Sequence, residues 1–168
     1  MPGSARASAL NGLPQDLLAP RRIALVGASP HHGSVGNAIW KNLVGSRSTI
    51  ELHAVGRHRV TSAGAHWHKS VDRLPPGPGL AILAVPAAEI AQMIRAIGSK
   101  GWRMAIVVSA GLGKETEPRR AMMAAAAETG VRLIGPNCLG ILLPRLAINA
   151  SFASSSPPGG NLALLSQS

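Results

Sequence analysis

Small residues crowd one stretch near the N-terminus, between an apolar run and a candidate helix. Ser29, Gly33, Ser34 and Gly36 follow the apolar residues 23–26. Apolar side chains at helical spacing come next, at residues 38–43. A strand–loop–helix unit of this kind can bring backbone N–H groups and a helix N-terminus against an anion, usually a phosphate. The stretch therefore predicts a phosphate-binding loop.

The loop departs from the two common phosphate-binding motifs. Ser29 stands where G-x-G-x-x-G has its second glycine, counted from Gly27. A Walker A loop is also excluded, because no Gly-Lys-Ser/Thr follows the glycines. An ordinary strand-to-helix connection that uses glycine for its turns remains the alternative interpretation.

The charge of the chain points to an anionic partner. The 168 residues suit one domain, and 17 Lys and Arg against 7 Asp and Glu give a net charge of +10. Arginines are spread along the chain, and neither an RNA-recognition nor a Cys/His finger signature is present, so we expect a phosphorylated small molecule rather than nucleic acid. The alternative is a basic surface that only contacts solvent.

The remaining composition indicates a cytoplasmic protein that does not contact membranes. Cys138 is the only cysteine, which fits a reducing compartment. The first residues lack the apolar core of a secretory signal, and no apolar run approaches the length of a membrane span.

Apolar runs alternate with helical patterns along the chain. Strands are expected at residues 23–26, 50–55, 80–85, 104–108 and 131–134. Helices are expected after Gly36, at 87–98 and at 115–129, with Gly130 as a C-cap. Residues 13–18 suit a helical turn, and residues 60–79 read as irregular. The pattern predicts an α/β fold, a doubly wound, mainly parallel five-stranded sheet with helices on both faces.

Three regions of the chain are expected. Residues 1–16 form a disordered or weakly ordered N-terminal segment, residues 17–153 form the domain, and residues 154–168 form a linker and the start of a following domain. In doubly wound sheets, ligands bind outside the carboxyl ends of the strands, near the topological switch point.

The turn after the second strand discriminates between nucleotides. NAD sites normally carry an acidic residue there, whereas this chain has Gly56-Arg57-His58-Arg59. Two guanidinium groups could engage an additional phosphate bidentately, which favours NADP or coenzyme A (CoA) over NAD. A solvent-facing basic turn is the alternative.

Small residues also follow the later strands. They are Val85-Pro86, Ser109-Ala110-Gly111 and Gly135-Pro136-Asn137-Cys138. They suit a groove that admits a ligand close to the backbone, although most loops have this composition. Without a neighbouring histidine to activate it, Cys138 reads as a packing residue rather than a nucleophile.

Two groups of histidines have the side chains that metal ions prefer. His66 and His68 would share one face of a strand, but no third ligand is close in the sequence. We therefore interpret them, and His31 and His32, as surface residues, although His31 or His32 could touch an anion in the loop.

Taken together, the motifs resemble the N-terminal CoA-binding domain of NDP-forming acyl-CoA synthetases. This family includes ADP-forming acetate–CoA ligase and is related to the alpha subunit of succinyl-CoA synthetase. The resemblance covers about residues 17–168, through residues 22–29 and 33–36, Val85-Pro-Ala87, Val108-Ser-Ala-Gly111, Gly135-Pro-Asn-Cys-Leu-Gly140, Asn149-Ala-Ser-Phe152 and Leu165-Ser-Gln-Ser168.

The resemblance implies CoA or acyl-CoA as the ligand and assigns residues to its parts. The diphosphate would lie on Ser29, Gly33, Ser34 and Val35, with Gly36 completing the loop. Val85, Pro86, Ser109, Ala110 and Gly111 would line the pantetheine arm, and Asn137 and Cys138 would close the thiol end. Where the family resembles Val-Asn-Pro-Lys, this chain has Val55-Gly56-Arg57-His58, so the role of the lysine passes to Arg57, His58 or Arg59.

The resemblance also implies partners and a reaction. The full enzymes interconvert acyl-CoA, ADP and phosphate with carboxylate, CoA and ATP, using a flavodoxin-like domain with a phosphohistidine and an ATP-grasp unit. Residues 166–168 resemble the turn that opens that second domain, so we expect either a domain of a longer ligase or a short stand-alone version. Alternatives are a regulatory CoA- or nucleotide-sensing domain of a GNAT-type acetyltransferase and an NADP-binding oxidoreductase domain.

Overall fold

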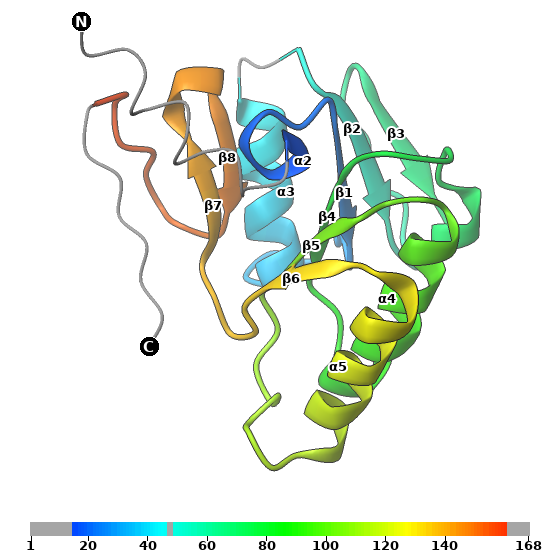
Figure 1. Cartoon of the computed structure of the whole chain (residues 1–168). Coiled ribbons are helices and arrows are strands. Elements are labelled where there is room, and N and C mark those ends of the chain that lie inside the picture. The colour runs from blue at the N-terminus through cyan, green and yellow to red at the C-terminus, as the bar shows by residue number, and fades with distance from the viewer. Residues whose placement is uncertain (1–14, 47–48, 161–168) are drawn as a thin grey trace, which may run out of the picture.

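The computed structural model describes residues 15–46 and 49–160. A six-stranded parallel sheet lies at its centre, with the strand order β3-β2-β1-β4-β5-β6 (Figure 1). The strands are β1 (Arg22–Val26), β2 (Glu51–Val55), β3 (Ala65–His68), β4 (Leu80–Leu83), β5 (Met104–Val107) and β6 (Arg132–Ile134). The expected α/β class with a doubly wound parallel sheet is confirmed.

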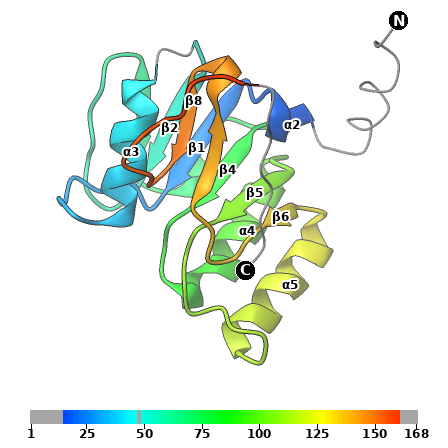
Figure 2. The ribbon, with the colours of Figure 1, turned by 90° about the vertical axis from the view of Figure 1, so that its left-hand side faces the viewer.

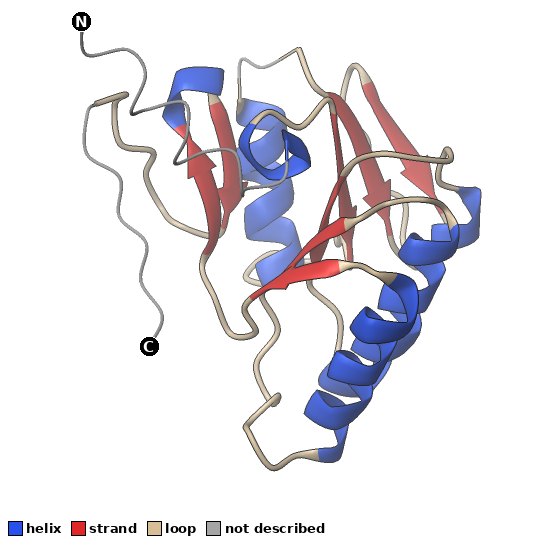
Figure 3. Cartoon of the chain, viewed as in Figure 1, coloured by secondary structure: helices blue, strands red, loops and turns tan. Residues whose placement is uncertain are grey.

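Helices cover both faces of the sheet (Figures 2 and 3). One face packs against α4 (Ile90–Ser99) and α5 (Glu117–Thr129), and the other against α3 (Val35–Gly45). Short elements complete the chain: α2 (Gln15–Leu18), η1 (Val71–Arg73), η2 (Ala87–Glu89) and η3 (Pro144–Leu146). Among the described residues, no helix has the length and apolar character needed to cross a bilayer.

The central strands are apolar because both of their faces are covered. All four residues of β4 are fully buried, and their side chains alternate between the two cores. Ala81 and Leu83 face α4 and α5, whereas Leu80 and Ile82 face α3. The helices pack on these strands with apolar residues at helical spacing, such as Ile90, Ile94 and Ile97 of α4.

The ends of α5 follow local signals. Thr116 is the N-cap with extended backbone dihedrals, and the helix begins two residues later than expected from the sequence. Gly130 has φ +69° in the left-handed region, and its N–H donates to Ala126 O, so the expected glycine C-cap is confirmed.

The sheet has one strand more than expected. β3 lies within residues 60–79, which the sequence indicated to be irregular. Its sequence, Ala-His-Trp-His, lacks the apolar run of a central strand, because β3 is an edge strand paired only with β2 in this sheet. Pairing with β2, rather than an apolar pattern of its own, gives this segment its structure.

An antiparallel hairpin of β7 (Gly140–Leu143) and β8 (Ile148–Ser151) packs on α3. Asn42 of α3 donates from Nδ2 to Ser151 O (2.8 Å) and Ala153 O (2.9 Å). Asn149 accepts at Oδ1 from both the backbone N–H and the hydroxyl of Ser151. The first and third residues of the Asn149–Phe152 motif are therefore buried and hold the hairpin together.

The expected terminal regions lie mostly outside the described residues. Of the N-terminal segment 1–16, only Gln15 and Asp16 are described, and both belong to α2. Residues 154–160 form neither helix nor strand, and the apolar run at residues 162–165 is not among the described residues.

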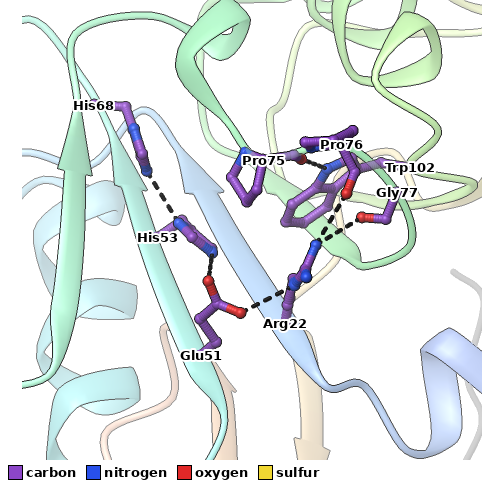
Figure 4. A network of polar contacts seen from close by, with 8 residues as sticks. All are labelled: Arg22, Glu51, His53, His68, Pro75, Pro76, Gly77 and Trp102. Carbon is purple, nitrogen blue, oxygen red and sulfur yellow. Dashed lines mark hydrogen bonds and ion pairs between the residues drawn. The ribbon is translucent and has the colours of Figure 1, made fainter.

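A polar network crosses three strands on the α4 face of the sheet (Figure 4). Arg22 binds Glu51 (Nε–Oε2 3.0 Å) and donates to the carbonyls of Pro76 and Gly77. His53 Nδ1 lies 3.0 Å from His68 Nε2. The other ring nitrogen of His53, Nε2, lies 3.1 Å from Glu51 Oε1, an ion-pair distance without the alignment of a hydrogen bond.

The surface interpretation is wrong for His68 alone, because His66, His31 and His32 are exposed as expected. His68 is half-buried and hydrogen-bonds to the buried His53, while the exposed His66 stacks on His53 with ring centroids 5.3 Å apart. Within residues 15–46 and 49–160, no group of three His, Cys, Asp or Glu side chains is arranged to hold a metal ion.

Burial favours the neutral form of His53 in the folded chain. Burial lowers the pKa of its imidazole to about 4, the nearby Glu51 opposes this shift, and His68 and His66 reinforce it. Burial, followed by the charge of His66, also lowers the pKa of His68.

Acid should destabilise the fold through His53. Because the folded-state pKa lies below the unfolded value, the unfolded chain binds the extra proton as pH falls from 6.5 towards 4, and stability is lost in that window. Between pH 7 and pH 4.5, the unfolding free energy of His53→Gln should therefore fall by about 2 kcal/mol less than that of the wild type. Urea unfolding at both pH values measures it, with the exposed His31→Gln as the control. Equal pH dependence in wild type and His53→Gln would contradict this assignment.

Candidate functional site

The carboxyl ends of the parallel strands meet at one edge of the sheet, as their parallel pairing requires. All the candidate residues from the sequence lie in the loops or first helical turns that follow β1, β2, β4, β5 and β6 at this edge. They are Ser29, Gly33, Ser34, Val35, Gly36, Arg57, His58, Arg59, Val85, Pro86, Ser109, Ala110, Gly111, Asn137 and Cys138.

Side chains of the β1–α3 loop stabilise the loop itself. Ser34 is the N-cap of α3: its Oγ accepts from the N–H of Asn37 (3.1 Å) and donates to His31 O (2.8 Å). Ser29 Oγ accepts from the N–H of His31, and Asn37 Nδ2 donates to Ser29 O. The two serine side chains therefore fix the shape of the loop before any ligand arrives.

Backbone amides remain as the donors for an anion. The N–H groups of Val35 and Gly36 come before Ala38, the first residue whose N–H donates to a backbone carbonyl of the helix (Ser34 O), and the positive end of the α3 dipole lies at the same place. Gly36 packs so closely on the end of β1 that a Cβ would collide with the carbonyl oxygen of Gly27. Gly33 has φ +83° in open space, which lets the loop turn outward before the helix.

The basic turn after β2 lies against this loop. A Cβ at Gly56 would collide with the carbonyl oxygen of Ala28, so the two backbones touch. Arg57, His58 and Arg59 are exposed, and His58 O accepts from the indole N–H of Trp67 (3.1 Å). The structure thus places the exposed side chains of this basic turn next to the backbone that begins the β1–α3 loop.

The loops after β4, β5 and β6 are joined to one another. Ser109 Oγ donates to Val85 O (2.5 Å), and the N–H of Asn137 donates to Ser109 O (3.1 Å). Pro86 and Asn137 are exposed, as are Ala110 and Gly111. Together they present a small-residue surface that continues the edge away from the basic turn.

Cys138 lies in the last of these loops and faces inward. Burial raises the pKa of its thiol, and Sγ donates to Val107 O at 3.3 Å. A thiol held protonated in this way is a poor nucleophile, which supports the packing interpretation.

Two groups of loops therefore share one edge. The loops after β1 and β2 carry amide donors and basic side chains, and the loops after β4, β5 and β6 begin with small neutral residues. They join where the N–H of Ala84 donates to Val26 O (2.8 Å) and where Arg57 Nη2 lies 3.5 Å from Glu89 Oε1. Such an arrangement can bind an extended ligand with an anionic end and a neutral arm.

Two residues of this edge were not found from the sequence. Asn37 is buried and holds the loop through Ser29 O, and Glu89 pairs with Arg57. Asn37 stands three residues after the N-cap, which is a usable signal, whereas the partner of Glu89 depends on the order of the strands.

The known proteins that this chain is similar to agree with one another. A family described as a CoA binding domain matches residues 21–144. The chain is 36% identical over 156 residues to the ADP-forming acetate–CoA ligase I of Archaeoglobus fulgidus, covering 90% of this chain and 22% of that protein. The alpha subunit of ADP-forming acetate–CoA ligase I from Pyrococcus furiosus is 31% identical, with 90% of this chain and 35% of the subunit covered.

Solved structures agree with these relatives. Acetyl-coenzyme A synthetase 1 of Ca. Korarchaeum cryptofilum, in complex with phosphate and ADP, matches with a TM-score of 0.79 and 25% identity over 88% of this chain and 32% of that one. The chain thus spans about a fifth to a third of the length of these relatives. With most of its length matched and the carboxyl edge built as described, the chain belongs to the CoA-binding domain family.

Proposed function

We propose that this chain binds CoA or acyl-CoA across the carboxyl edge of its sheet. The amides of Val35 and Gly36 hold the diphosphate, and Arg57, helped by His58 and Arg59, holds the ribose phosphate. The pantetheine arm runs along Val85, Pro86 and Ser109 to Gly111, and its thiol end reaches Asn137 and Cys138. The observation that carries the proposal is the placement of the α3 amides beside the basic turn, with a neutral surface adjoining both.

The site needs several contacts acting together. A helix N-terminus contributes roughly 0.3–1 kcal/mol per favourable anion contact, and this gain falls with salt. A guanidinium that engages a phosphate bidentately adds a stronger, geometrically specific contact. Because the serines and Asn37 already fix the loop, little ordering is required on binding.

In a longer ligase, this domain would position CoA for acyl transfer. The sulfur of CoA forms a bond to the acyl carbon of an acyl phosphate, the carbon–oxygen bond to phosphate breaks, and the thiol proton is released. Flavodoxin-like and ATP-grasp parts of such an enzyme would carry the phosphoryl group. The present chain contributes binding and orientation.

Ligand selectivity tests the proposed function. Isothermal titration of the chain with CoA, acetyl-CoA, NADP and NAD should show preference for CoA and acetyl-CoA, with affinity that falls as salt rises. Preference for NADP would favour the oxidoreductase alternative, and binding of none of the four ligands would contradict the proposal for this chain.

A proline substitution tests the role of the α3 amides. Val35→Pro deletes one N–H at the first helical position, where proline is compatible with the helix and with the extended Ser34 before it. We expect CoA affinity to fall about tenfold, the value of one charge-assisted hydrogen bond. Val35→Ala is the matched control, because it shortens the same exposed side chain and keeps the amide. If thermal unfolding shows both variants folded and both bind CoA equally well, the diphosphate does not lie on this amide.

A further inference from the structure

One ion pair crosses the end of the central strand. Arg57 follows β2 and Glu89 ends η2 after β4, and β1 lies between β2 and β4 in the sheet. The two side chains approach to 3.5 Å, so they reach over the carboxyl end of β1. The pair therefore lies beside the β1–α3 loop, where the ligand phosphates are proposed to bind.

Glu89 lies at the start of α4 as its N-cap residue, and no capping hydrogen bond holds its side chain there. The helix dipole favours a negative charge there. Its side chain is 38% exposed and that of Arg57 is 87% exposed, so water screens their pairing.

We propose that Glu89 is the resident counter-ion of the ribose-phosphate site. In the free chain the carboxylate of Glu89 neutralises the guanidinium of Arg57, and the phosphate of the incoming ligand displaces it. This inference rests on the proposed CoA binding and assigns a specificity-determining role to a residue outside the recognised motif. Glu89 then sets how much affinity the ribose phosphate adds.

The exchange runs in a defined direction. A screened carboxylate–guanidinium pair at 3.5 Å is weak, whereas a phosphate carries more charge and engages a guanidinium bidentately. After displacement, the carboxylate remains close to the bound phosphate and repels it. Glu89 therefore lowers the affinity for ligands that carry the phosphate and leaves those that lack it nearly unaffected.

The test compares CoA with dephospho-CoA, which lacks the ribose phosphate. Glu89→Gln keeps the shape of the side chain and removes its charge. Titration calorimetry should show CoA binding about three- to tenfold tighter and dephospho-CoA binding changed by less than about twofold. When Arg57 is already replaced by alanine, Glu89→Gln should increase the affinity for CoA much less.

Glu128→Gln is the matched control. Glu128 also forms an exposed ion pair, with Arg95 at 2.7 Å, but it lies at the C-terminal end of α5, away from the carboxyl edge. This variant changes the net charge by the same amount and should bind CoA as the wild type does. A similar gain in both glutamine variants would mean that net charge alone is responsible.

Other outcomes separate this inference from the proposed function. If Glu89→Gln weakens CoA binding or leaves it unchanged, the role of Glu89 is overturned while CoA binding stands. The same holds if the substitution tightens the binding of CoA and dephospho-CoA equally. If Arg57→Ala leaves CoA binding unaffected, the role of Glu89 is likewise overturned. Failure of both wild type and Glu89→Gln to bind CoA overturns the proposed function and this inference with it.

Discussion

The close packing of α3 on the end of β1 sets the geometry of the whole carboxyl edge. Gly36 lies so near the carbonyl oxygen of Gly27 that no side chain fits between them. The helix dipole and its unpaired amides consequently point at the place where the strand stops. Ser34 caps this helix and Asn37 secures the loop before it, so the same residues that begin the helix also shape the proposed anion site. One close contact between backbones therefore positions both the start of α3 and the proposed binding surface.

Much of the fold could be predicted because the central strands are buried on both sides. The strands β4 and β5 are apolar throughout, β1 is apolar after Arg22, and the glycine at position 130 marks the end of α5. The polar edge strand β3 and the β7–β8 hairpin were not predicted. The strand takes its structure from pairing with β2, and the hairpin takes its structure from packing on the distant α3 and from the local Asn149–Ser151 hydrogen bonds.

The candidate site, like the fold, could be predicted from the sequence only in part. Its loop residues could be chosen from the sequence, because small residues directly after apolar runs fall at one edge of any parallel sheet. The contacts that shape the site could not, since they join different loops. Ser109 to Val85, Asn137 to Ser109 and Arg57 to Glu89 all depend on the order β2-β1-β4-β5-β6. His53 shows the limit most plainly, because its burial between two strands and Trp102 gives no signal in its own segment.

The central claim is that CoA lies along the carboxyl edge, and mapping of backbone amide chemical shifts on ¹⁵N-labelled protein tests it most directly. Titration with CoA should shift the amides of Val35 and Gly36, those of the turn at residues 56–59, and those of the loops at 85–87, 109–111 and 137–138. Dephospho-CoA should reproduce these shifts except in the turn at 56–59. Shifts confined to another surface, such as the outer face of α5 and the edge of β6, would contradict the account.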